Sequence, residues 1–97
     1  MFLVHIEVQH PEHTALPALA ADEALGESGV EHAGVHLGAG PRPVLALYVR
    51  AESAAAAALL ATHCWARLTG AVELAGWTVA AIRVHRPQES TGLGPGP

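Results

Sequence analysis

The sequence predicts an α+β domain in which four strands and two helices follow one another in the order βαββαβ. Three observations support this prediction. Residues 2–9 alternate apolar and polar side chains, as a half-buried strand does. Residues 54–69 are rich in helix-forming residues, with Ser53 before the run and Gly70 after it. Residues 77–86 alternate again, and 97 residues suffice for one hydrophobic core.

Each predicted strand has one fully apolar side. In the first strand, the apolar side is Phe2, Val4, Ile6 and Val8, and the other side is Leu3, His5, Glu7 and Gln9. In residues 30–37 the two sides are Ala33, Val35 and Leu37 against His32, Gly34 and His36. In residues 43–50 they are Leu45, Leu47 and Val49 against Val44, Ala46, Tyr48 and Arg50. In residues 77–86 they are Ala80, Ile82 and Val84 against Val79, Ala81, Arg83 and His85.

Two helices are expected between the strands. Thr14 is predicted to cap the first, with Pro17 in its first turn and its end near Leu25. Ser53 is predicted to cap the second, which Gly70 ends. Its core stripe is Ala57, Leu60, Ala61, Cys64 and Leu68, so the Cys64 thiol should be buried. Trp65 lies beside this stripe and covers either the end of the sheet or a partner subunit.

This element order predicts a ferredoxin-like domain, an antiparallel sheet of strand order 4-1-3-2 with both helices on one face. Residues 1–87 form the domain, and residues 88–97 form a flexible tail rich in glycine and proline. The helices cover the apolar side of every strand. The opposite side of the sheet is therefore left open.

Composition and charge exclude several classes of function. The net charge is −4, lysine is absent and the five arginines form no run, so we expect no nucleic-acid binding. The single cysteine excludes a disulfide framework and a CxxC motif. Neither a signal peptide nor an apolar run of transmembrane length is seen, so we expect a cytoplasmic protein without membrane attachment.

The open side of the predicted sheet collects four of the seven histidines. Strands one and four are antiparallel neighbours, so Glu7 should meet Arg83 and His5 should meet His85. The candidate catalytic residues are His5, Glu7, Tyr48, Arg83 and His85. The candidate substrate-binding residues are His32, His36 and Arg50. His10 and His13 flank Pro11 in a loop and are interpreted as surface residues.

A sheet face that merely meets solvent is the simplest alternative. The centre of this one would contain Val44, Ala46, Val79 and Ala81, which is too apolar to remain exposed. A core with twenty alanines also buries little area per residue. We therefore expect a homodimer formed through this face.

Three segments, MFLVHIEV, YVRAESAAAAALLA and WTVAAIRVHRP, resemble small dimeric α+β-barrel proteins of the muconolactone-isomerase-like and YCII-like families. The resemblance implies two sheets packed face to face around a shared lumen. The chain departs from the YCII-like pattern at 62–65, where THCW replaces an Asp-Pro, and no Arg-x-x-His follows the first strand. The catalytic residues of these families are therefore not transferred to this chain.

These observations leave three functions open. The first is a cofactor-independent enzyme acting on a small organic substrate in the lumen, an isomerase, cyclase or lyase, or a cofactor-free monooxygenase. His5 or His85 would be the acid or base, Tyr48 a donor and Arg83 an anion contact, while Glu7 would orient His5. The second is a ligand-binding or accessory domain without catalysis. The third is a metal-binding module that uses the histidines, although His32 and His36 are about 13 Å apart along a regular strand.

Overall fold

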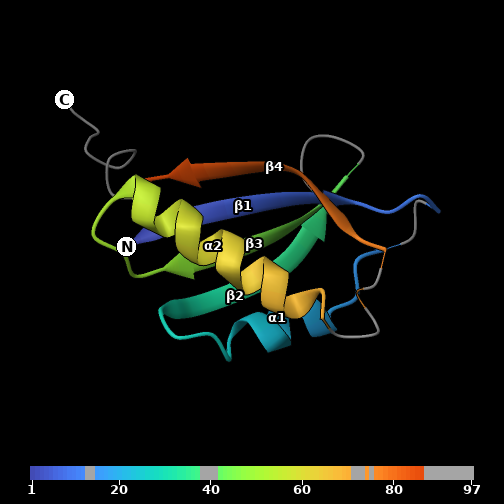
Figure 1. Cartoon of the computed structure of the whole chain (residues 1–97), viewed down its shortest axis with the longest axis horizontal. Helices are drawn as coiled ribbons and strands as arrows, with labels where there is room; N and C mark the ends of the chain where they lie inside the picture. Colours follow the sequence, from blue (N-terminus) through green and yellow to red (C-terminus); the bar gives the residue numbers. More distant parts are fainter. Residues whose placement is uncertain (13–14, 38–41, 71–73, 75, 87–97) are drawn as a thin grey trace.

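The protein is a four-stranded antiparallel sheet with two helices on one face (Figure 1). The computed structural model describes residues 1–12, 15–37, 42–70, 74 and 76–86. The elements are β1 (Phe2–Gln9), α1 (Leu19–Ala24), β2 (Val30–Leu37), β3 (Pro43–Val49), α2 (Ala54–Leu68) and β4 (Thr78–His85). The strand order is β2-β3-β1-β4, which confirms the predicted α+β, ferredoxin-like arrangement. The predicted tail at 88–97 lies outside the described residues.

The core lies between the two central strands and the helices. On the helix-facing side of β1 and β3, six aliphatic side chains have no exposed surface: Val4, Ile6, Val8, Leu45, Leu47 and Val49. These residues pair across the strands, with Val4 opposite Leu47 and Ile6 opposite Leu45. The alternation read from the sequence therefore corresponds to one buried side and one open side.

Helix α2 follows the predicted pattern closely. The Ser53 hydroxyl accepts a hydrogen bond from the backbone N–H of Ala56 at 3.1 Å and so caps the helix. The predicted stripe faces the sheet, and Ala57, Ala61, Cys64 and Leu68 are buried on it. Trp65 belongs to the same core and is 7% exposed, so the buried face of α2 is wider than the predicted stripe.

Helix α1 is shorter than predicted and begins later. Pro17 precedes the helix instead of lying in its first turn, and its carbonyl accepts a hydrogen bond from the N–H of Ala20 at 3.0 Å. A proline disfavours helical backbone in the residue before it, which explains why the helix does not extend back through Leu16. The predicted cap Thr14 lies outside the described residues.

A β-bulge changes the side of the sheet to which one predicted open-face residue belongs. Glu7 pairs with Ala81, but Val8 pairs with Val79, so β4 has one extra residue at this point. Val79 is therefore opposite the fully buried Val8, on the helix side, and the prediction that it lies on the open face is wrong.

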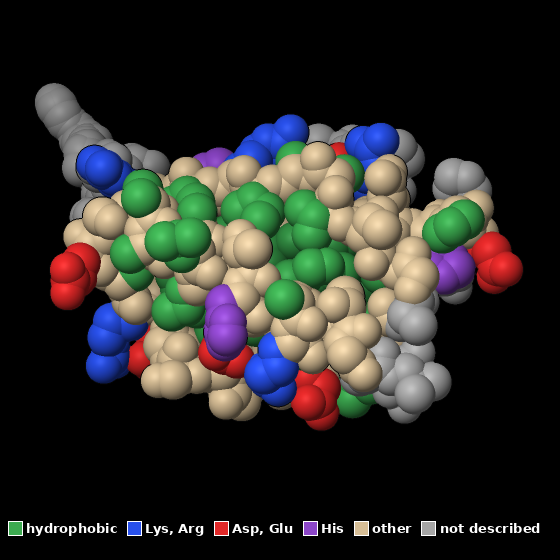
Figure 2. All heavy atoms as spheres, in the orientation of Figure 1, with side chains coloured by type: hydrophobic (Ala, Val, Ile, Leu, Met, Phe, Trp, Pro, Cys, Tyr) green, Lys and Arg blue, Asp and Glu red, His purple; other side chains and the backbone are tan. Residues whose placement is uncertain are grey.

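Apolar side chains also reach the surface over and beside α2, where Leu59 is 72% exposed (Figure 2).

An ion pair connects α2 to the loop before β2. Arg67 Nε lies 2.6 Å from Glu27 Oε1, and a second guanidinium nitrogen of Arg67 donates to the carbonyl of Glu23 at 2.8 Å. Cys64 is buried beneath this pair. Its burial, and secondarily the negative charge of Glu27, raise the pKa of the Cys64 thiol to about 11.

Cys64 should therefore resist thiol reagents in the folded protein. At pH 8 the thiolate is scarce and the sulfur is inaccessible, so native labelling should be negligible over hours, while labelling in denaturant should be rapid and stoichiometric. Mass spectrometry of the protein after timed exposure to a maleimide measures both rates. Equal rates with and without denaturant would contradict the burial of this face of α2.

Candidate functional site

The open face of the sheet is the side opposite the helices. Strand register arranges its residues in three rows that cross the sheet in the order β4, β1, β3, β2. The first row is His85, Leu3, Tyr48 and His32. The second is Arg83, His5, Ala46 and Gly34, and the third is Ala81, Glu7, Val44 and His36.

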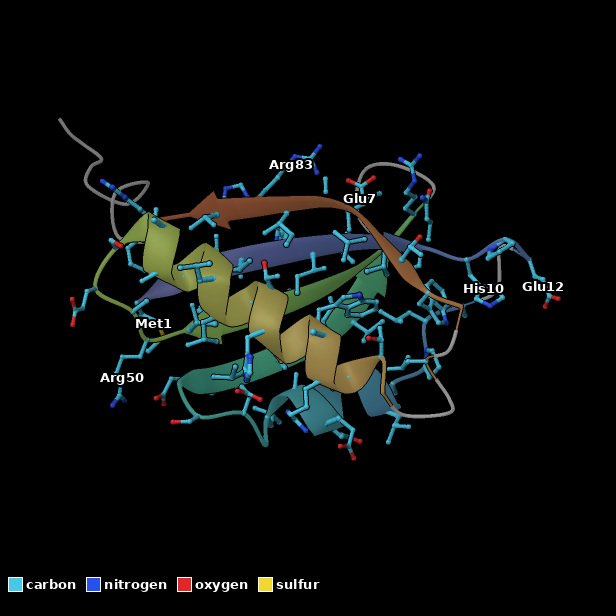
Figure 3. The ribbon with its side chains drawn as sticks, in the orientation of Figure 1. Met1, Glu7, His10, Glu12, Arg50 and Arg83 are labelled. Carbon is cyan, nitrogen blue, oxygen red and sulfur yellow. The ribbon has the colours of Figure 1, made fainter. Side chains whose placement is uncertain are left out.

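Glu7 is held between two arginines from different parts of the chain. Arg83 on β4 donates to one carboxylate oxygen at 2.7 Å, and Arg42, immediately before β3, donates to the other at 2.9 Å. Arg42 also donates through Nε to the Gln9 side chain at 3.1 Å. Figure 3 shows Glu7 and Arg83 next to one another at the β4 side of the sheet. We call Glu7, Arg42 and Arg83 the Glu7 cluster.

The Glu7 cluster carries an excess of positive charge. The hydrogen bonds from Arg83 and Arg42 hold the pKa of the Glu7 carboxyl below its ordinary value of 4.5, so Glu7 is anionic at neutral pH. Two guanidinium ions share this one carboxylate, which leaves a net charge of +1 in a chain whose formal charge is −4. This part of the open face is therefore suited to an anionic group.

Two imidazoles meet beside the Glu7 cluster. The rings of His5 and His85 have centroids 5.0 Å apart and an interplanar angle of 62°. The predicted pairs of His5 with His85 and Glu7 with Arg83 are thus confirmed as contacts. They are diagonal contacts, however, because His5 is directly opposite Arg83, and His85 is directly opposite Leu3.

A second aromatic contact lies across the sheet from the imidazole pair. His32 on β2 is directly opposite Tyr48 on β3, and their rings make an edge-to-face contact with centroids 6.2 Å apart. Tyr48 is 38% exposed and His32 is also exposed. Both predicted site residues are therefore accessible on the open face.

Two other predicted site residues have different outcomes. The backbone of His36 pairs with Val44 on the open-face row, but its side chain lies outside the described part of the structure. Arg50 lies just beyond β3 and forms a 2.7 Å ion pair with Glu31. Figure 3 shows Arg50 near Met1, at the opposite end of the molecule from His10 and away from the Glu7 cluster.

The apolar centre of the open face is smaller than predicted. Val79 belongs to the other side, and Val44 is only 7% exposed within the single chain. Ala46 and Ala81 remain partly exposed, and Leu3 adds to them. The apolar surface available for an interface is thus limited to Leu3, Ala46 and Ala81.

Sequence reasoning missed Arg42 and the packing of His10 against another part of the chain. Arg42 continues the open-side alternation of Val44, Ala46 and Tyr48 back by two residues, which is the signal that would have found it. His10 is a partly exposed loop residue, while His13, predicted to be the same, lies outside the described residues. The His10 ring lies 5.2 Å from that of the buried Trp77, and its Nδ1 accepts a hydrogen bond from the N–H of Glu12 at 3.1 Å.

The described residues contain neither a metal-binding cluster nor a membrane-spanning helix. Among them, no three histidine, cysteine, aspartate or glutamate side chains come together in a way that could hold a metal ion. In the same part of the chain, none of the helices has the length and apolar character needed to cross a membrane.

Comparison of the chain with protein-family models, curated proteins and solved structures gave no significant match. The site is therefore interpreted from its own geometry and charge.

The Glu7 cluster predicts a specific pH dependence of stability. Because folding lowers the pKa of Glu7, its stabilising contribution is complete above about pH 4.5 and is lost as the pH falls through the lower folded-state value. Glu7→Gln should therefore unfold more readily than the native protein above that pH, and the difference should shrink as the pH is lowered. Urea unfolding from pH 2.5 to 7 measures it, with the exposed Glu52→Gln as a control for loss of a surface charge. A difference that stays constant across this range would contradict the cluster.

Proposed function

We propose that the protein is a homodimeric, cofactor-independent enzyme that performs acid/base chemistry on a small organic substrate at the open face. The observation that supports this best is the contact between His5 and His85 beside the cationic Glu7 cluster. Imidazole is the side chain whose charge changes most readily near neutral pH, so a pair of imidazoles suits proton transfer. Isomerase, cyclase and lyase reactions all need such a transfer.

The proposed roles divide between proton transfer and charge stabilisation. His5 or His85 removes and returns the proton. Arg83 has five N–H donors, of which the bond to Glu7 uses one, so it can also contact the negative charge that develops on the substrate. Tyr48 supplies a hydroxyl donor, and Glu7 fixes the arginines in place. His32, opposite Tyr48, contacts the rest of the substrate.

The proposed dimer closes the site. Neither α1 nor α2, the helices of the described residues, covers Leu3, Ala46, Ala81 or Tyr48, and a second sheet packed on this face would enclose them with the imidazoles. Enclosure excludes water and strengthens the interaction of the arginines with a bound anion.

A ligand-binding domain without catalysis is the second candidate. It is favoured by the same excess positive charge, which binds an anion whether or not a proton is transferred. Loss of proton transfer with retention of binding would identify this alternative.

Dimerisation should depend on the centre of the open face. Light scattering at about 50 µM should give twice the chain mass of 10.0 kDa. Ala46→Arg introduces a cation between His5 and Gly34 and should yield a folded monomer, whereas Ala66→Arg on the exposed side of α2 should remain dimeric. A monomeric native protein, or a dimeric Ala46→Arg variant, would exclude this interface.

Proton transfer should depend on the imidazole pair. Incorporation of deuterium from D₂O into a panel of small keto acids and lactones, followed by NMR, reports the reaction whatever its product. His5→Ala or His85→Ala should slow the exchange by about 10²–10⁴-fold while the melting temperature changes little, because neither side chain belongs to the core. His63→Ala, on the opposite side of the molecule, is the matched control. Full activity in both open-face variants would exclude the pair from catalysis.

A further inference from the structure

We infer that the ligand of the open face is a planar organic anion, whose carboxylate lies against Arg83 and the imidazole pair and whose flat body lies over Ala46 and Gly34. This inference rests on the proposed function, because it names the class of substrate that the same site takes. It is carried by the charge of the Glu7 cluster and by the order of side chains along the second row of the open face.

The net positive charge of the Glu7 cluster favours a negatively charged ligand. Arg83 and Arg42 carry two positive charges against the single negative charge of Glu7, and all three lie on one side of the sheet. Arg83 is exposed and is directly opposite His5, so an oxygen of the ligand can reach the guanidinium and an imidazole together. Planar guanidinium groups bind carboxylates through two parallel hydrogen bonds, which distinguishes a carboxylate from a neutral group.

The sizes of the side chains in the second row favour a flat ligand. Its side chains become smaller from one edge of the sheet to the other, in the order Arg83, His5, Ala46 and Gly34. A Cβ built on Gly34 would meet no atom within 4 Å, so the space above this glycine is open. Adjacent strands are about 4.8 Å apart, and the rows on either side lie about 7 Å away, so a flat ring can lie along the small residues of this row with the side chains of the neighbouring rows on either side.

The first row places two aromatic side chains next to the second row. Tyr48 and His32 form an edge-to-face pair immediately beside Ala46 and Gly34, and both rings are exposed. Aromatic side chains favour stacked or edge contacts with another ring. A planar ligand can therefore contact the small residues beneath it, the aromatic rings beside it and the arginine at one end. A compact, non-planar anion would contact only the arginine.

Titration of the full-length protein with three probes tests the inference. Benzoate is planar and anionic, cyclohexanecarboxylate is anionic but not planar, and benzamide is planar but uncharged. Amide chemical shifts at Gly34, Ala46 and Arg83 should move saturably with benzoate. The other two probes should bind at least tenfold more weakly.

Two variants separate the two parts of the inference. Gly34→Val fills the open space with a residue that favours strands, so the protein should fold and bind benzoate at least tenfold more weakly. Arg83→Gln should weaken benzoate binding similarly while Arg42 continues to hold Glu7. Ala66→Val introduces the same side chain on the exposed side of α2 and should bind as the native protein does.

The outcomes distinguish failure of the inference from failure of the proposed function. Equal binding of benzoate and cyclohexanecarboxylate, or unchanged binding by Gly34→Val, would overturn the planar ligand even if proton transfer is observed. The absence of any saturable shift with benzoate would overturn the inference as a whole. Benzoate binding that depends on Gly34 and Arg83, in a protein that is monomeric or transfers no proton, would support the inference and refute the proposed enzyme.

Discussion

One-sided burial of the two central strands is the constraint on which the rest of the structure depends. Six side chains of β1 and β3 have no exposed surface, and burying one such aliphatic side chain contributes about 1.5–3 kcal/mol. A slip of one residue in either strand would move three of them to the other side of the sheet, at a cost similar to the whole stability of a small domain, about 5–15 kcal/mol. The positions of His5 and Glu7 on the open face are fixed by this cost.

The Glu7 cluster is a consequence of this sidedness. Glu7 lies on the central strand β1, so it can reach Arg83 on one neighbouring strand and Arg42 at the start of the other. Its carboxylate thereby links β1 to β4 and to the residue that precedes β3, and leaves one unbalanced positive charge on the open side. The imidazole pair lies beside this charge because alternation brings His5 and His85 to the same face.

Much of the fold could be predicted because its signals are local. Each of three features depends on fewer than twenty consecutive residues: the alternation of β1, the Ser53 cap and the buried stripe of α2. All three appear in the structure. The contacts between His5 and His85 and between Glu7 and Arg83 followed from the strand order. Their diagonal geometry did not, because register depends on how two strands pair.

The errors come from pairing and from backbone restrictions that alternation does not report. The bulge in β4 moves Val79 to the helix side, and nothing within residues 77–86 indicates where the extra residue falls. Pro17 delays the start of α1, although a proline is also compatible with a first helical turn. His10 is packed against Trp77, which is distant in sequence, and only the folded chain brings them together.

Coverage of the open face in solution is the most direct test of the account, because the proposed dimer and enclosed site both require it. Paramagnetic relaxation of methyl protons by a soluble gadolinium complex measures this coverage one residue at a time. The Ala46 methyl should be protected at high protein concentration and become accessible on dilution, while the methyls of Leu59, 72% exposed on α2, should be accessible throughout. An Ala46 methyl whose relaxation does not change with protein concentration and matches that of Leu59 would show that the face is open to solvent and would contradict the enclosed site.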